Sequence, residues 1–212
     1  EERAVPQEPR QATAATQPFP IGDPFVTQTL DIPPEGFDLT NQGKIFTPFW
    51  DEPILLKRGE ANWPPSTVDP KKGYIYVCAG ERQAAYSTQT DTDLATSGDR
   101  YTGGSMRFAP VPTTGVVAAV NLRDNKVVWS QRWSSRCYSG LVASAGGLVF
   151  AGRNDGRFTA IDSENGRKLW EFMTDAGVNA PPATFQHEGE QYVAVLSAGN
   201  LIAGSKRGDS VW

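Results

Sequence analysis

The chain has 212 residues, 39% of them hydrophobic, and a formal net charge of −4. A chain of this length can bury a real apolar core, and its acidic balance, with no basic run, argues against a nucleic-acid partner. The apolar runs are too short to cross a bilayer. The single histidine, His187, excludes a zinc site with several histidine ligands, and no glycine-rich phosphate loop supports nucleotide binding.

The first part of the chain is rich in proline, since residues 1–70 hold 12 of the 16 prolines. Because proline removes a backbone donor and fixes φ, a regular sheet is not expected through most of this region. We expect residues 1–60 to form an extended segment that packs on a folded body through its aromatic side chains. Disorder is the alternative for residues 1–15.

The next part of the chain predicts a first group of strands. Tyr74 to Cys78 is rich in aromatic and β-branched residues, which favour strands, and Val116 to Val120 and Lys126 to Trp129 continue the group. Residues 80–114 lie between them and are polar with little periodicity. We therefore expect this segment to be a long loop inserted into the group.

A second group of strands is predicted between Gly140 and Phe172. Short apolar or alternating runs follow one another there, separated by turn sequences such as Asn154-Asp155-Gly156 and Glu164-Asn165-Gly166. Asp-Gly and Asn-Gly turns between alternating runs are strong signals for hairpins, because these residues accept positive φ. The pattern predicts an antiparallel meander and not a helix.

Part of this second group repeats a pattern found 41 residues earlier in the chain. Ala160-x-Asp162-x3-Gly166-x3-Trp170 follows Ala119-x-Asn121-x3-Asn125-x3-Trp129 without a gap. Asn in place of Gly at the turn is physically sensible, since both residues tolerate the left-handed conformation. A period of this length, with strands, turns and a recurring Trp, is typical of β-propeller blades. A β-sandwich with similar turns is the alternative.

The full division of the chain follows from the repeat. We expect an all-β protein in which residues 61–212 form about three blades, over residues 61–135, 136–175 and 176–212. The last blade stops at Trp212 inside a predicted strand, and closed propellers need about four to eight blades. We therefore expect the chain to be part of a longer protein, or to be completed by other chains.

The two cysteines, Cys78 and Cys137, form no C-x-x-C pair and no haem-attachment motif. We expect two buried free thiols, with a disulfide between them as the alternative. Replacing Cys78 by Ser is then expected to leave any binding site nearly intact.

Four segments of the chain resemble the C-terminal part of the quinoprotein alcohol dehydrogenases, which use pyrroloquinoline quinone (PQQ). They are Thr16 to Pro20, Ala61 to Trp63 followed by Asp69 to Val77, Ala160 to Trp170, and Gly177 to Pro182 with Gln191 to Val193. The resemblance implies an eight-bladed propeller with PQQ and a calcium or lanthanide ion near its axis. It also implies that each repeated Trp packs between neighbouring blades, so Trp129 and Trp170 are both expected to be buried.

The resemblance assigns three candidate cofactor-binding residues. Asn62 and Trp63 match the pair that contacts the quinone, and an amide and an indole N–H are suitable donors to quinone oxygens. A turn residue and a core tryptophan are the alternatives for these two positions. Tyr138 falls where the family has a Trp, so its contact is a departure from the family pattern.

The resemblance places the metal ligands and the catalytic Asp base in N-terminal blades that this chain does not show, so no catalytic and no metal-binding residue is assigned here. It implies a periplasmic dehydrogenase that oxidises an alcohol or sugar-type substrate by hydride transfer to the quinone, with the chain alone catalytically incomplete. Expected partners are the missing blades, the small-molecule substrate, and a cytochrome or quinone electron acceptor. The alternative is a non-catalytic propeller that acts as an assembly scaffold.

Overall fold

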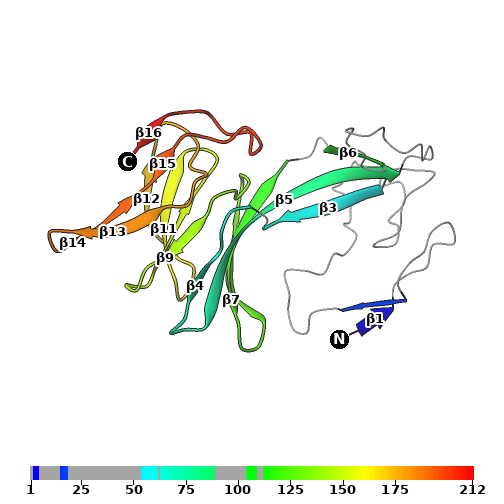
Figure 1. Ribbon diagram of the computed structural model, residues 1–212, viewed down its shortest axis with the longest axis horizontal. Coiled ribbons are helices and arrows are strands. Elements are labelled where there is room, and N and C mark those ends of the chain that lie inside the picture. Colours follow the sequence, from blue (N-terminus) through cyan, green and yellow to red (C-terminus); the bar gives the residue numbers. More distant parts are fainter. Residues whose placement is uncertain (1, 5–14, 19–53, 62, 89–103, 109–111) are drawn as a thin grey trace, which may run out of the picture. The chain divides into compact units, whose positions relative to one another are not determined.

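The structure is a computed structural model that describes residues 2–4, 15–18, 54–61, 63–88, 104–108 and 112–212. Every regular element in these ranges is a β-strand (Figure 1). Accordingly, the described ranges contain no helix that is long and apolar enough to cross a membrane. The chain divides into two compact units, formed by residues 1–21, 25–58 and 82–112 and by residues 22–24, 59–81 and 113–212.

The first unit contains short antiparallel pairings. β1 (Glu2–Ala4) pairs with β2 (Thr16–Pro18), and the distal half of β5 (Tyr74–Thr88) pairs with β6 (Gly104–Phe108). β3 (Ile54–Glu60) also pairs with β5. The expectation of a wholly irregular insertion over residues 80–114 is therefore wrong at its two sides. Backbone hydrogen bonds extend a two-stranded ladder without needing an apolar pattern, so the polar sequence concealed it.

The second unit opens with four antiparallel strands of a six-stranded sheet, in which β3 and β6 also pair with β5. Their order is β4 (Thr67–Asp69), β5, β7 (Thr114–Asn121) and β8 (Lys126–Trp133). The β7–β8 turn uses Asn125 at φ 60°, the left-handed conformation expected from its sequence match to Gly166, whose φ is 77°. This sheet forms the first blade.

A second antiparallel sheet follows directly. Its order is β9 (Leu141–Ala143), β10 (Leu148–Gly152), β11 (Arg157–Asp162) and β12 (Lys168–Met173). The central strands β10 and β11 are buried, since they present Val149, Phe158 and Ile161 to the core. The predicted meander between Gly140 and Phe172 is confirmed.

The two sheets share the same strand register, which confirms the repeat. Ala119 pairs with Trp129 in the first sheet, and Ala160 pairs with Trp170 in the second. In both sheets the register then shifts at the next residue, where a bulge accommodates one extra residue. Such a match in register and in bulge position is the behaviour of one structural unit used twice, and the propeller expectation is confirmed.

Trp129 connects the first two sheets. It is 8% exposed, and its indole N–H donates to the backbone oxygen of Ser163 at 3.0 Å. Its ring lies against Gly166, where an added Cβ would come within 2.6 Å of the indole. The glycine is therefore needed both for its positive φ and for the space that the ring occupies.

Trp170 does not repeat this packing, although it occupies the equivalent position. It is 50% exposed, so the expectation that both tryptophans are buried is wrong for Trp170. The reason is that burial comes from the following blade. The turn of the second sheet covers Trp129, whereas no equivalent turn covers Trp170 among the described residues.

The remaining strands belong to a third set. β13 (Ala183–His187) pairs with β14 (Glu190–Ala194), and β15 (Leu196–Ser197) pairs with β16 (Ser210–Val211). Among the described residues, the core forms two clusters. One joins the first two sheets around Tyr76, Trp129 and Ile161, and the other joins β10 and β11 to the third set around Phe150, Phe158 and Val178.

Candidate functional site

Three irregular segments meet at the points where the chain enters its successive sheets. We call residues 63–66, 136–140 and 177–182 the lead-in segments, because they precede β4, β9 and β13. The N–H of Leu141 donates to the oxygen of Pro65 at 3.0 Å. A Cβ added at Gly140 would lie 2.9 Å from a Pro65 ring atom and 2.4 Å from the Cβ of Pro181. The three segments are therefore in direct contact, and only glycine fits at their centre.

The structure leaves Trp63 on the surface of the first lead-in segment. Its side chain is 80% exposed in the part of the chain that the structure describes. An exposed indole of this kind offers one N–H donor and a flat apolar face to a ligand. Asn62, the other member of the predicted pair, lies outside the described residues.

Tyr138 lies in the second lead-in segment and is buried, at 6% exposure. The guanidinium carbon of Arg136 lies 4.2 Å from the centre of its ring, a distance at which a cation and an aromatic face attract each other. Arg136 also donates to the backbone oxygen of Ile202 at 3.1 Å. The tyrosine is therefore part of a packed wall with a positive charge held against its ring.

Asn179 is the residue of this site that sequence reasoning missed. Its side-chain amide donates to the backbone oxygen of Tyr138 at 2.9 Å and to Oδ1 of Asn154 at 2.7 Å. Its own oxygen accepts from the hydroxyl of Ser205 at 2.6 Å. The signal was present in the sequence, because Asn179 lies 41 residues after Tyr138, the same interval that separates the repeated tryptophans.

Cys78 and Cys137 form a disulfide, so the expectation of two free thiols is wrong. Their Cα atoms lie 5.5 Å apart although 59 residues separate them in sequence. β5 carries Cys78 into the middle of the first sheet, and the second lead-in segment returns along the same sheet with Cys137 immediately before Tyr138. The sequence contained no motif for this pairing, because it depends on how the sheet folds back.

Several charged groups outside the lead-in segments have shifted pKa values that report contacts within the second unit. A hydrogen bond to Glu164 raises the pKa of Lys72, which also donates to the hydroxyl of Ser163 at 2.8 Å. Burial lowers the pKa of Arg153, whose guanidinium carbon lies 3.9 Å from the centre of the Trp133 ring. These cations hold the first two sheets together.

In the part of the chain that the structure describes, no three His, Cys, Asp or Glu side chains lie close enough to hold a metal ion. His187 is exposed at the end of β13, with its Nε2 3.8 Å from a carboxylate oxygen of Glu188. Four further acidic residues, Asp51, Glu52, Asp91 and Asp93, lie outside the described residues.

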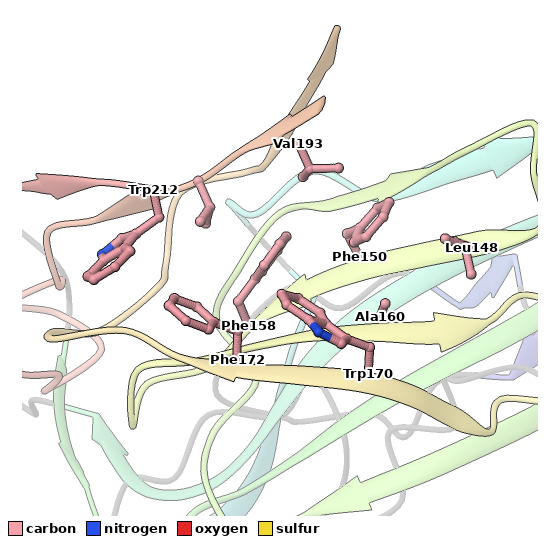
Figure 2. A pocket seen from close by; sticks show the side chains of 9 residues that line it. Leu148, Phe150, Phe158, Ala160, Trp170, Phe172, Val193 and Trp212 are labelled. Atoms are coloured by element: carbon pink, nitrogen blue, oxygen red, sulfur yellow. The ribbon is translucent and has the colours of Figure 1, made fainter. Parts of the chain in front are cut away.

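An apolar cavity of about 510 Å³ opens beside Trp170 (Figure 2). Its lining is almost wholly apolar and comes from the second sheet and from the third set of strands. The lining residues are Leu148, Phe150, Phe158, Ala160, Trp170, Phe172, Val193, Val195 and Trp212. Figure 2 shows the Trp170 and Phe172 rings side by side, and these rings are stacked with their centres 6.0 Å apart. With no polar group converging on it, this cavity does not resemble a catalytic site.

Comparisons with known proteins agree with the propeller fold. The family described as "Glucose/ethanol/alcohol dehydrogenase, beta-propeller domain" (PQQ) matches residues 102–193. The chain is similar to a quinoprotein ethanol dehydrogenase of Pseudomonas aeruginosa, with 34% identity over 65% of this chain and 22% of the relative. It is also similar to a lanthanide-dependent methanol dehydrogenase of Methylorubrum extorquens, with 30% identity over 83% of this chain and 28% of the relative.

Solved structures show the same likeness. The quinohemoprotein alcohol dehydrogenase of Comamonas testosteroni matches 71% of this chain and 25% of its own chain, with a TM-score of 0.58 and 25% identity. A europium-containing methanol dehydrogenase matches 69% of this chain and 27% of its own, with a TM-score of 0.57 and 27% identity. The chain thus spans about a quarter of the length of the relatives that it matches.

Proposed function

Because the chain belongs to the family of PQQ-dependent quinoprotein alcohol dehydrogenases, we propose that it forms one side of the PQQ pocket of such an enzyme. The enzyme oxidises an alcohol or sugar-type substrate. The observation that carries the proposal is the meeting of the three lead-in segments, of which the first carries the 80% exposed Trp63 and the second the buried Tyr138. A scaffold has no need of an exposed indole at this position.

The residues of the lead-in segments fit a planar, negatively charged quinone. Trp63 offers an indole face and one donor, and Arg136 holds a guanidinium charge against the Tyr138 ring of the second lead-in segment. Asn62, Trp63 and Tyr138 are the residues that would hold the group. When bound, the quinone supplies a two-electron acceptor, and the protein supplies its orientation and its electrostatic surroundings.

The rest of the catalytic apparatus is assigned to other blades. In this proposal the calcium or lanthanide ion, its ligands and the catalytic base lie outside this chain, and eight blades make up the complete propeller. The other blades, in the same polypeptide or in another chain, cover the apolar cavity beside Trp170, whose half-exposed rings are unsuited to permanent contact with water. The enzyme works in the periplasm and passes electrons to a cytochrome or a quinone.

The experiment that tests this function measures PQQ binding in the complete protein with Ca²⁺ or a lanthanide present. Trp63→Ala and Asn62→Ala are each expected to weaken PQQ retention about tenfold or more, because a buried hydrogen bond to a polar cofactor contributes about 1–3 kcal/mol. The melting temperature of the protein without cofactor should change little for Trp63→Ala, since the side chain is exposed. Trp63→Phe keeps a flat ring and removes the N–H, so it separates stacking from hydrogen bonding.

Leu122→Ala is the matched control, because Leu122 is an exposed apolar residue in the turn after β7, at the far end of that strand from Cys137. It should retain wild-type PQQ affinity. Wild-type PQQ affinity and turnover in both Asn62→Ala and Trp63→Ala would refute the proposed pocket and favour the non-catalytic scaffold.

A further inference from the structure

The second lead-in segment is held in an unusual way for a stretch without regular structure. Arg136, Cys137, Tyr138, Ser139 and Gly140 form no strand, yet all five are buried. Buried irregular backbone must find hydrogen-bond partners outside itself, so such a segment is ordered only if neighbouring elements hold it. The structure shows two sets of holding contacts, one from the first sheet and one from the third lead-in segment.

The first sheet holds the residues on both sides of Tyr138. Cys137 is covalently joined to Cys78 of β5, and the N–H of Ser139 donates to the Cys78 sulfur at 3.4 Å. Gly115, at the start of β7, leaves no space between the two elements, because a Cβ there would lie 2.3 Å from the nitrogen of Cys137. The backbone on either side of the tyrosine is therefore fixed to one sulfur bridge.

The third lead-in segment holds Tyr138 and Ser139. Asn179 donates to the Tyr138 oxygen at 2.9 Å, and the hydroxyl of Ser139 donates to the oxygen of Ala180 at 3.4 Å. Asn179 is itself fixed by Asn154 and Ser205, at 2.7 and 2.6 Å. It has no donor left for a ligand, so its role is to position Tyr138.

We propose that the Cys78–Cys137 disulfide and Asn179 are positioning residues for the cofactor pocket, which hold Tyr138 in its binding conformation before the quinone arrives. The proposal rests on the proposed function. Preorganisation of this kind strengthens binding because the segment does not have to be ordered when the ligand binds. It also reverses the expectation for free thiols, under which a change at Cys78 has little effect on binding.

The main test replaces both cysteines, as Cys78→Ala with Cys137→Ala, in the complete protein, so that no reactive thiol remains. Releasing the segment should raise the Kd for PQQ about tenfold, which corresponds to about 1.4 kcal/mol. In the protein without cofactor, hydrogen exchange at the Ser139 and Leu141 amides should become at least tenfold faster. Asn179→Ala leaves the disulfide intact and should produce the same two changes, which keeps the proposal testable if the double variant folds poorly.

A control is needed because loss of a disulfide also lowers global stability. Gly166→Ala supplies it, since it strains the Trp129 contact and touches no lead-in segment. It should lower the melting temperature while the Kd for PQQ and the Ser139 exchange rate stay at wild-type values.

An unchanged Kd and unchanged exchange in the disulfide-free variant would overturn the proposal, as would an equal loss of affinity in Gly166→Ala. A wild-type protein that binds no PQQ would instead refute the proposed function. The exchange measurement does not depend on PQQ, so it would still report whether the disulfide and Asn179 order the segment.

Discussion

Removing the indole of Trp129 should weaken the contact between the first two sheets more than any other single truncation there. The ring is 8% exposed, lies against Gly166, and is 6.0 Å from the Tyr76 ring between centres. Large core truncations cost about 3–5 kcal/mol, of which a lost hydrogen bond such as that to Ser163 accounts for about 1 kcal/mol. Trp129→Ala should therefore lower the melting temperature by roughly 10 °C in a unit of this size.

The assay is thermal and urea unfolding followed by circular dichroism, which does not depend on tryptophan fluorescence. Trp129→Phe keeps most of the apolar contact and removes the indole N–H, so it should lower the free energy of unfolding by about 1–2 kcal/mol. Ser130→Ala, at the neighbouring exposed position of β8, should be close to neutral. Equal stabilities for Trp129→Ala and Ser130→Ala would show that the indole does not join the two sheets.

Three further outcomes are expected. Gly166→Ala should lower the free energy of unfolding by about 2–4 kcal/mol, because φ is +77° and the new Cβ would meet the Trp129 indole. When Trp129→Ala is already present, the same glycine substitution should lower it by less. Fully additive losses in the double mutant would contradict the contact. Burial acts to raise the pKa of Glu171, but the hydrogen bond from Lys168 and the charges of Arg153 and Arg157 outweigh it and hold the pKa below its usual 4.5. The stability that these contacts supply is present above that value and lost as the pH falls through the lowered pKa, so Glu171→Gln should flatten the acid side of a plot of melting temperature against pH, and an unchanged curve would disprove this role. Residues 1–212 alone should self-associate through the apolar cavity beside Trp170, as measured by sedimentation at several concentrations, whereas a monomer that melts cooperatively would refute this.

The strand pattern and the repeat were predictable from the sequence because they depend on neighbours. Turn residues such as Asn125 and Gly166 indicate positive φ, and the alternation of polar and apolar residues in the strands between turns sets which side chains face the core. The 41-residue interval then placed Trp129 and Trp170 at equivalent positions, with the same partner and the same bulge.

The candidate site was predictable in part. The resemblance named Trp63 and Tyr138 as candidates, and the structure shows that the segments carrying them are in contact. Asn179 was within reach of the same repeat, but its role became visible only when its amide was seen to meet the Tyr138 oxygen. An asparagine in a loop has many local partners available, so its sequence position does not tell which one it selects.

The sequence by itself determined the strands and turns of the two repeated sheets and the period that makes them blades, because these follow from interactions between residues a few positions apart. Only the tertiary structure decided that Cys78 and Cys137 are bonded, and that one of two equivalent tryptophans is buried while the other is half exposed. Both outcomes depend on which surface the folded chain brings against a residue from far away in sequence. A disulfide requires two Cα atoms within a few ångströms of each other, and a tryptophan is buried only where the next blade supplies its cover.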